Sequence, residues 1–487
     1  MEGIQWIILS ILVGALMILC KSWFTKTMEL PPGPRKLPVI GNLHQLNKGG
    51  ELVHVTLAKM AQQHGKIMTV WFGGQQPSIV VSHHDAAWEV LVTKASDFSS
   101  RTLPYMSKFS SADWYTLATC NLGPFWQNLR KGLQTTTLNP HTFSAQVHLQ
   151  EKDISNLILD LKEEASLNGG IVKPMIPLRR TTIQLIGRFC FGAEFEDKDG
   201  FVENIDTVME ETIRLSGHAR LVDVFEFTRY IPGFRLLFKE AYELKRKIEE
   251  TIRPYIRRYK SSTNCFLQFL LSQEDYSEEV VIFNLFEQFL LSTDSTSNTT
   301  SWALAYLIHN EKIQEKVYEE VQELTRSGRS REEMVTIEEV SKLKYVNAAV
   351  KEVLRMKPIA PLAVPHQAVC DSNLMGMKVR KGTPVMVNIY AVHYDPTVWV
   401  EPERFMPERF LSKPDVAMER SLIVFGAGRR ICAGMDLAKL QVALTLANLV
   451  NSFRWSCVSE GQLPDLSEDL SFILRMKTPL VAHIVPR

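Results

Sequence analysis

One cysteine in the last part of the chain stands among residue types that could bind a metal-centred ligand. Cys432 lies in residues 425–434, FGAGRRICAG, which follow the pattern F-x-x-G-x-R-x-C-x-G. The glycines allow tight turns and a close approach to a flat ligand, because they carry no Cβ. Backbone N–H groups left free by such a turn can point at the sulfur and tune its electron donation. The spacing therefore makes Cys432 a candidate metal ligand.

The same segment offers a cation for acidic groups on that ligand. Arg430 presents a planar fork of donors that suits a carboxylate, such as a haem propionate. A thiol that binds haem iron loses its proton on binding. A buried structural cysteine before a helix is the alternative for any lone cysteine. Because five positions of the pattern match together, the segment favours a thiolate ligand to haem iron at Cys432.

A polar stretch interrupts the longest predicted helix, which runs from Val280 to His309 and would span roughly 45 Å. Residues 292–301 read STDSTSNTTS, with apolar residues on both sides. Hydroxyl and amide side chains compete for backbone hydrogen bonds and can open a helix locally. A polar face toward solvent is the alternative. Because both flanks are apolar, we expect the polar stretch to line a cavity.

Two further groups of residues could hold the cavity in shape. Glu352 and Arg355 are three residues apart and share a helix face, which alone would be typical of a surface ion pair. Arg409, within PERF (407–410), adds a second arginine that could enclose Glu352 and hold an irregular loop. Trp126 and Arg130, four apart on one helix, form a donor pair suited to a carboxylate, although the pair alone identifies no ligand.

The elements that must position these residues are mostly helical. Helical periodicity recurs in residues 52–63, 143–167, 201–215, 240–259, 280–309, 312–324 and 437–453. Strand-like patterns are short and occur in residues 67–72, 78–81, 383–388 and 480–484. Glycine and proline punctuate residues 358–434, which predicts irregular loops there. The sequence therefore predicts a mainly α fold with a small β-sheet.

Composition excludes several functional classes. The chain has 487 residues, a net charge of +1 and no long basic block, which argues against nucleic-acid binding. Its seven cysteines are scattered without a C-x-x-C pair, which argues against a disulfide framework or a zinc module and for a reducing compartment. No linker or repeat divides the body, so we expect one large domain.

The N-terminal segment has a different character. Residues 4–20, IQWIILSILVGALMILC, carry no charge, and with residues 21–24 they reach about 20 residues, enough to cross a bilayer. A cleaved signal peptide is the alternative. The basic residues follow the apolar run, which places the body on the cytosolic face. We therefore predict a membrane anchor (1–27), a proline-rich hinge around PPGP (28–50) and a catalytic domain (51–487).

Over essentially its whole length, the chain resembles a membrane-anchored cytochrome P450, a haem-thiolate monooxygenase of the plant endoplasmic-reticulum type. The features that carry this resemblance occur in order: the apolar anchor, PPGP, Trp126-x-x-x-Arg130, the long helix with Asp294-Ser295, Glu352-x-x-Arg355, PERF and the cysteine loop. The resemblance implies the cytochrome P450 fold, haem b, O2 as co-substrate, and a single-pass anchor in the endoplasmic reticulum membrane. It also implies electrons from NADPH through a separate reductase, since the chain has no nucleotide-binding fingerprint.

The resemblance also implies roles for individual residues. Cys432 would be the axial thiolate, and Asp294 and Ser295 would be catalytic residues over the face where oxygen is bound and protonated. The haem propionates would lie near Trp126, Arg130, His366 and Arg430. The structural triad would be Glu352, Arg355 and Arg409. The substrate pocket would be lined by Phe286, Leu290, Leu291, Thr293, Ile359, Leu362 and Ile473.

Finer patterns point to one subfamily. The segments L-x-x-D-S-T-S-x-T-T-x-W-A-L-A-Y-L, RMKPIAPLAVPH and ICAGMDLAKLQ resemble the methylenedioxy-bridge-forming subfamily of plant alkaloid and lignan metabolism. Three positions depart from the common distal pattern. Leu291 stands where alanine or glycine is usual. Ser292 stands where glycine is usual, and Ser295 lacks the methyl group that fixes a threonine rotamer. The resemblance thus implies closure of an ortho-hydroxymethoxy arene to a methylenedioxy ring.

The substrate remains open at this stage. A cationic alkaloid would need a carboxylate or an aromatic cage, whereas a lignan would need neither. Asp113 is the one loop carboxylate that the sequence suggests, and solvent exposure is its alternative. The loops therefore slightly favour a lignan, such as matairesinol giving pluviatolide. The alternatives are a benzylisoquinoline or protoberberine alkaloid, simple hydroxylation of a plant metabolite, or a haem-binding sensor or scaffold without catalysis.

Overall fold

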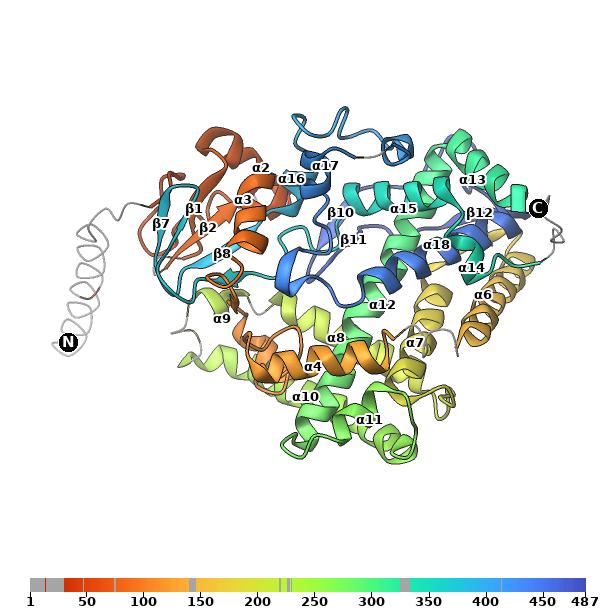
Figure 1. The fold of residues 1–487 in the computed structure, drawn as a ribbon, viewed down its shortest axis with the longest axis horizontal. Coiled ribbons are helices and arrows are strands. Elements are labelled where there is room, and N and C mark those ends of the chain that lie inside the picture. Colours follow the sequence, from red (N-terminus) through yellow and green to blue (C-terminus); the bar gives the residue numbers. More distant parts are fainter. Residues whose placement is uncertain are drawn as a thin grey trace, which may run out of the picture.

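The structure, a computed structural model, describes residues 14, 30–46, 48–73, 76–139, 146–218, 220–225, 228, 230–324, 333–412 and 414–487. Helices dominate these ranges and the strands are short, which confirms the predicted mainly helical fold with small sheets (Figure 1). Within the same ranges, no helix is both long and apolar enough to span a bilayer. The predicted anchor, apart from Gly14, lies outside the described residues.

The longer α-helices make up most of the fold, and α12 is the central one. They are α2 (Val53–His64), α4 (Pro124–Thr136), α6 (Val147–Leu167), α7 (Met175–Phe191), α8 (Phe201–His218), α10 (Arg235–Tyr259), α12 (Glu278–His309), α13 (Glu311–Glu323), α15 (Lys344–Met356) and α18 (Met435–Ser452). Shorter helices are α3 (His84–Trp88), α9 (Arg220–Val224), α11 (Phe266–Leu271), α14 (Ile337–Val340), α16 (Ile389–His393) and α17 (Val416–Ser421). The central helix α12 crosses the molecule and contacts α7, α10, α15 and α18 (Figure 1).

The strands form small sheets at the edges of the helical body. The largest sheet has the order β1 (Ile67–Trp71), β2 (Pro77–Val81), β8 (Pro384–Val387), β5 (His366–Gln367) and β3 (Ser100–Arg101). In it only β2 and β8 are parallel. The other sheets are β4 (Ile171–Val172), β12 (Ala482–Pro486) and β9 (Phe453–Ser456); β10 (Glu468–Leu470) and β11 (Leu474–Met476); and β6 (Ser372–Leu374) and β7 (Met377–Val379).

The cavity lies where helix α12 changes from apolar to polar residues. Its first half, up to Leu290, packs in one hydrophobic cluster with α7, α8 and α10. Its last part, from Trp302 to Ile308, packs in a second cluster with α15 and α18. The polar stretch 292–301 lies between these clusters, and the helix stays continuous through it. Its hydroxyl groups are satisfied within the helix, since they donate to carbonyl groups one turn earlier.

Most periodic segments appear as helices close to their predicted limits, but α7 was not predicted. Eleven of its 17 residues are buried. Its polar face is narrow, with Arg180, Thr181, Gln184 and Arg188, and Arg179 and Thr182 are polar residues on its buried side, so the period of 3.6 that reveals an amphipathic helix is weak. Burial by neighbouring helices therefore hides α7 from a sequence pattern.

Candidate active site

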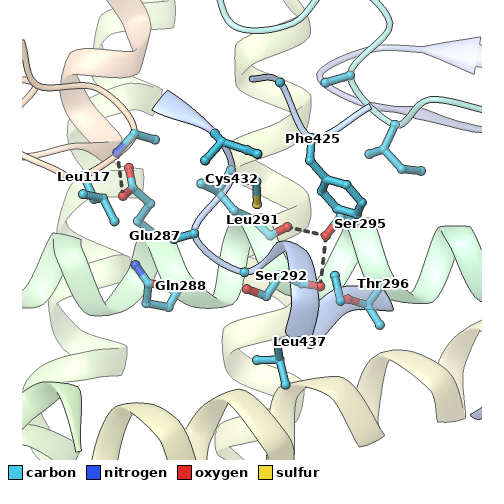
Figure 2. A pocket seen from close by; sticks show the side chains of 18 of the residues that line it. Leu117, Glu287, Gln288, Leu291, Ser292, Ser295, Thr296, Phe425, Cys432 and Leu437 are labelled. Carbon is cyan, nitrogen blue, oxygen red and sulfur yellow. Dashed lines mark hydrogen bonds between the residues drawn. The ribbon is translucent and has the colours of Figure 1, made fainter. Parts of the chain in front are cut away.

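A cavity of about 390 Å³ lies beside the polar part of α12 and is lined mostly by apolar surface. Figure 2 shows the Cys432 sulfur and the side chains of Leu291, Ser292 and Ser295 around it. Of the predicted site residues, those that line the cavity are Trp126, Arg130, Leu290, Leu291, Ser295, Ile359, His366, Arg430, Cys432 and Ile473. The cavity thus brings together residues from distant parts of the chain.

Local backbone geometry places the Cys432 thiol in this cavity. The Cys432 N–H donates to the Phe425 carbonyl group at 2.9 Å and closes the loop. Gly426 and Gly428 adopt positive φ angles of 73° and 66°, a region that glycine enters at little cost. A Cβ on Gly428 would lie 1.9 Å from the Leu91 carbonyl oxygen. These two glycines are therefore needed for the turn and for its packing.

Cys432 is exposed to the cavity, and its surroundings include groups that favour the ionised form of the thiol. Burial raises the pKa of the Cys432 thiol, while a hydrogen bond from the Gly434 backbone and the positive charge of Arg130 lower it. A metal ion at the sulfur would remove the proton outright. The donors that would stabilise the resulting thiolate are therefore already in place.

Three arginines line the same cavity. Arg130 donates to the Ile431 carbonyl group at 2.8 Å, and Arg430 donates to the Ser99 and Cys120 carbonyl groups at 3.0 and 2.7 Å. Among the described residues, none of the three arginines forms an ion pair. The third, Arg101, has a buried Nε without a hydrogen-bond partner.

The three arginines favour an anionic ligand. Burial and the neighbouring Arg430 lower the pKa of Arg101 to about 9. Clustered, half-buried cations are unfavourable unless an anion compensates them. The two propionates of a haem provide such compensation, and the facing thiol provides an iron ligand. The residues of this cavity therefore fit haem b.

Arg101 was not predicted as part of the haem site. It pairs with His366 across β3 and β5, so the sheet places both residues beside the cavity. His366 Nδ1 lies 2.7 Å from the Phe98 carbonyl oxygen, and burial lowers the pKa of its imidazole to about 3, so the ring is neutral. A single arginine in a two-residue strand gives no sequence signal, since only the β3–β5 pairing brings it to the site.

Trp126 occupies the predicted place with a different contact. Its indole N–H donates to the Leu117 carbonyl group at 3.1 Å, so it is not free for a carboxylate. The Arg430 guanidinium lies over the Trp126 ring, 5.5 Å from its centroid. Trp126 thus packs against the guanidinium group of Arg430. Arg130 lines the cavity, where its N–H groups can donate to a ligand.

Four of the predicted site residues lie away from the cavity lining. Asp294, Phe286, Thr293 and Leu362 are not among the residues that line the cavity. Phe286 and Thr293 are buried on the opposite face of α12, and Leu362 packs beside the cluster around β1 and β2. Helical periodicity gives the spacing of residues on α12, but it does not tell which face meets the cavity.

Asp294 points toward α7 instead. It forms a buried ion pair with Arg179, which also contacts Asp206 at 2.5 Å and Glu210 at 3.3 Å. Burial raises the pKa of Asp294 to about 6, against the opposing effect of Arg179. The second carboxylate oxygen of Asp294 is buried without a hydrogen-bond partner. Asp294 is thus adjacent to Ser295 in the helix but lies outside the cavity lining.

Ser295 does line the cavity. Its hydroxyl group donates to the Leu291 carbonyl group at 2.7 Å and to the Ser292 carbonyl group at 3.3 Å (Figure 2). The Leu291 side chain is 40% exposed, and this exposed surface faces the cavity. Leu291, which is larger than the alanine or glycine of the common distal pattern, therefore narrows the space beside the Ser295 hydroxyl group.

The three charged residues of the predicted triad meet as expected. Glu352 and Arg355 are fully buried, and Arg355 donates to both Glu352 oxygens at 2.8 and 2.9 Å. Arg409 donates to Glu352 Oε1 at 3.0 Å and to the Val400 carbonyl group at 3.0 Å. Because Arg355 also donates to the Pro402 carbonyl group at 2.7 Å, the triad holds the irregular chain after α16.

Sequence analysis also missed Glu287, which lines the cavity. It lies one helical turn before Leu291 and two turns before Ser295, on the edge of the same face. The spacing of these three residues is the only sequence signal. Most of the residues around Glu287 are apolar, so the sequence did not distinguish Glu287 from the buried residues of the first half of α12.

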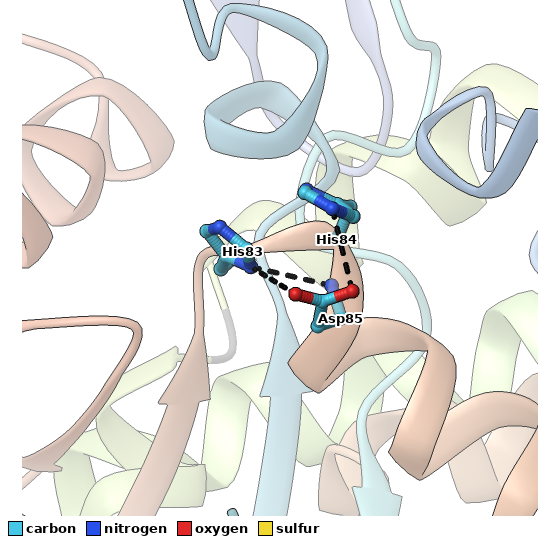
Figure 3. Close-up of side chains that lie close together, drawn as sticks. All are labelled: His83, His84 and Asp85. Carbon is cyan, nitrogen blue, oxygen red and sulfur yellow. Dashed lines mark hydrogen bonds and ion pairs between the residues drawn. The ribbon is translucent and has the colours of Figure 1, made fainter. Parts of the chain in front are cut away.

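A second group of chemically active side chains lies outside the cavity, at the start of α3 (Figure 3). The His83 and His84 rings stack with centroids 4.2 Å apart, and His84 Nε2 lies 3.3 Å from Asp85 Oδ1. His83 Nδ1 accepts the Asp85 N–H at 3.3 Å and caps the helix. These contacts explain the group as a local helix cap on the surface.

Comparison with known proteins places this geometry in a family. The chain is 50% identical to (S)-canadine synthase of Papaver somniferum, covering 99% of this chain and 97% of that protein. It is 44% identical to pluviatolide synthase of Podophyllum peltatum, covering 100% and 98%. A solved zebra fish cytochrome P450 with abiraterone has a TM-score of 0.74 at 23% identity, covering 89% and 99%. Residues 31–483 match the family described as cytochrome P450, and the chain belongs to that family.

Proposed function

We propose that this protein closes a methylenedioxy ring on an ortho-hydroxymethoxy aromatic plant metabolite. As a cytochrome P450, it is an oxidoreductase that uses haem b, O2 and electrons from NADPH through a separate reductase. Its similarity along the whole chain to synthases named for canadine, stylopine and pluviatolide supports the finer assignment. The observation that carries the oxidase chemistry is the cavity that joins Cys432 to the polar face of α12.

Haem binding follows from the charges around the cavity. Cys432 would hold the iron, and Arg101, Arg130 and Arg430 would hold the propionates, with neutral His366 beside them. The haem, when bound, supplies the activation of O2 and the removal of a hydrogen from the substrate. The loop from Phe425 to Cys432 fixes the sulfur, since its hydrogen bond and two glycine turns set the position of the thiol.

The reaction balances without incorporation of oxygen into the product. The O-methyl group loses one hydrogen, the neighbouring phenol loses another, and a new C–O bond closes the ring. The substrate gives two electrons and NADPH gives two, which together reduce O2 to two molecules of water. Apolar residues exclude water and hold the methyl group beside the phenol oxygen, so that closure is intramolecular. Those residues are Leu290, Leu291, Ile359 and Ile473.

Proton supply is the role that Ser295 and Asp294 would share. The Ser295 hydroxyl lies in the cavity, and Asp294 is its neighbour in the chain with a carboxyl pKa of about 6. Arg179 connects Asp294 to Asp206 and Glu210, whose side chains are 35% and 47% exposed. Because Asp294 can hold a proton near neutral pH, it would supply that proton to the hydroxyl group of its chain neighbour, while Arg179 holds the carboxylate in place.

Simple hydroxylation is the alternative for the same machinery, and product mass separates the two reactions. The test uses microsomes with the recombinant protein, its reductase and NADPH, supplied with methoxyphenol lignans and alkaloids. Ring closure gives a product that lacks two hydrogens, whereas hydroxylation gives a product with one added oxygen. Recovery of the protein in the microsomal fraction would also test the predicted endoplasmic-reticulum anchor.

A further inference from the structure

Glu287 differs from the other buried acids of the described chain. The buried acidic residues are Asp153, Glu287, Asp294 and Glu352. Three of them pair with arginine: Asp153 with Arg188, Asp294 with Arg179, and Glu352 with Arg355. Among the described residues, Glu287 has no cation within ion-pair distance, and it is the one buried acid that lines the cavity.

The contacts of Glu287 leave its charge uncompensated. Its Oε1 accepts the Thr116 hydroxyl at 2.5 Å, and its Oε2 accepts the Ala118 N–H at 3.0 Å. Both donors are neutral, and each carboxylate oxygen can accept a further hydrogen bond. An ionised carboxylate in a buried site is unfavourable unless a cation pairs with it. A cation inside the cavity would complete this site.

Burial also affects the titration of the group. It raises the pKa of Glu287 to about 7, while the hydrogen bonds from Thr116 and from the backbone of Ala118 and Leu117 lower it. The nearby Cys120 thiol has its pKa raised to about 12 by burial and by Glu287, so that thiol stays neutral. A neighbouring positive charge would favour the ionised carboxylate. The site is therefore suited to a cation that arrives with the substrate.

The position of Glu287 matches a substrate that carries its charge away from the reacting ring. Glu287 and Ser295 are eight residues apart on α12, about 12 Å along the helix axis. Leu291 lies between them, and all three line the cavity (Figure 2). A rigid polycyclic molecule could place its methoxyphenol ring near Ser295 and its charged atom near Glu287.

We propose that Glu287 binds the protonated amine of the substrate. The substrate is then a basic methoxyphenol alkaloid of the benzylisoquinoline or protoberberine type, rather than a neutral lignan. A neutral ligand would leave the carboxylate unpaired or protonated, and would gain no charge pairing from it. This inference rests on the proposed ring closure and selects one of the two substrate classes that the sequence leaves open.

A structural role for Glu287 makes a different prediction. The same hydrogen bonds attach residues 116–118 to α12, so Glu287 also anchors this loop. Loss of a loop anchor would weaken the binding of neutral and cationic ligands alike. Loss of a charge partner would weaken the binding of cationic ligands alone. The two roles are therefore separable by comparing ligands that differ in charge.

The experiment uses the full-length holoenzyme in membranes with two probes that share an ortho-hydroxymethoxy ring. One probe is a tetrahydroprotoberberine with a basic tertiary amine, and the other is the neutral lignan matairesinol. Dissociation constants come from the shift of the haem Soret band on titration, and KM values from turnover with reductase. The variant is Glu287→Gln, and the matched control is Glu278→Gln, an exposed position at the start of the same helix.

In the wild-type protein, we expect the amine to bind at least about tenfold more tightly than matairesinol. Glu287→Gln should weaken amine binding by roughly tenfold to a hundredfold, with less than about a twofold change for matairesinol, and Glu278→Gln should change neither. Equal weakening of both probes, or no change for the amine, would overturn the proposal. If Glu287→Gln does not fold, tighter binding of matairesinol by the wild type overturns it instead.

The outcomes also separate this inference from the proposed reaction. Ring closure on matairesinol with a lower KM than on the amine would contradict the role of Glu287 but keep the proposed function. Hydroxylated products from both probes, without ring closure, would contradict the proposed function. In that case, a dependence of amine binding on Glu287 would still show that Glu287 binds the amine, whatever reaction the enzyme catalyses.

Discussion

Arg355 and His393 each bind the backbone carbonyl group of the other. Arg355 Nη1 donates to the His393 carbonyl oxygen at 2.8 Å, and His393 Nδ1 lies 2.8 Å from the Arg355 carbonyl oxygen. His393 Nε2 then accepts the Ile423 N–H at 3.2 Å. The Ile423 carbonyl group in turn accepts the Gly426 N–H at 2.8 Å, at the start of the Cys432 loop. A continuous set of hydrogen bonds therefore connects the triad to the thiolate loop.

Removal of the His393 side chain should loosen this loop. His393→Ala leaves the Arg355 carbonyl group and the Ile423 N–H without their buried partner, at a cost of roughly 3 kcal/mol in the free energy of unfolding. We expect a lower haem content and a weaker carbon monoxide difference spectrum of the thiolate type. His393→Gln, which retains a donor and an acceptor, should recover part of both. An alanine variant with wild-type haem content would contradict the proposed connection.

The same histidine should make stability depend on pH. Burial lowers the pKa of His393 from 6.5 to about 3. Between these values the unfolded chain binds a proton that the folded protein does not, so stability falls as pH falls, by about 1.4 kcal/mol per pH unit. His366 acts in the same direction, whereas Glu287 and Asp294, with raised pKa values, act in the opposite one.

A variant isolates the His393 contribution from the others. Between pH 6.5 and pH 5, wild-type protein should lose about 2 kcal/mol more stability than His393→Gln. Urea unfolding at several pH values measures this difference. Parallel loss of stability in the two proteins would show that His393 is not held neutral in the folded state.

Glu352→Gln should have one of the largest effects on stability in the chain. It leaves the buried guanidinium groups of Arg355 and Arg409 without their shared carboxylate. Breaking a buried ion pair costs about 3–5 kcal/mol. We expect little folded holoenzyme at growth temperature, as measured by haem content and thermal unfolding. Glu319→Gln, an exposed position on α13, serves as the control, and equal behaviour of the two variants would contradict a structural role for Glu352.

Asp294→Asn should slow turnover without weakening substrate binding. Asp294 does not line the cavity, so the dissociation constant of the substrate should stay within about twofold of wild type. Loss of a proton donor should lower turnover by roughly a hundredfold. Steady-state rates in H2O and D2O should show a larger solvent isotope effect in the variant. Weakened binding with normal turnover would assign Asp294 to packing with α7 instead.

Ser295→Ala should separate NADPH consumption from product formation. The hydroxyl group is the polar atom of α12 that faces the cavity at this position. Without it, we expect NADPH to be oxidised with less than about a tenth of the wild-type yield of ring-closed product. Ser297→Ala, which removes a buried hydroxyl on another face of the helix, should retain wild-type coupling. Equal coupling in Ser295→Ala and wild type would exclude the serine from proton supply.

Sequence patterns identified residues whose spacing alone defines a local geometry. The glycines around Cys432, the i, i+3 pair of Glu352 and Arg355, and the periodic helices are of this kind. The cavity face of α12 was not predictable, because a helix with polar residues on several faces gives no signal for which one meets a neighbour. Arg101 and Glu287 reach the cavity only through a strand pairing and helix packing between distant segments.

The central claim is that the cavity beside Cys432 closes a methylenedioxy ring. The most direct test supplies the enzyme, its reductase and NADPH with an ortho-hydroxymethoxy substrate whose methoxy group is O–CD3. Ring closure predicts a product that has lost one deuterium and one protium and retains an O–CD2–O bridge. A product that keeps all three deuterons and gains an oxygen, or one that loses the whole methyl group, would contradict the account.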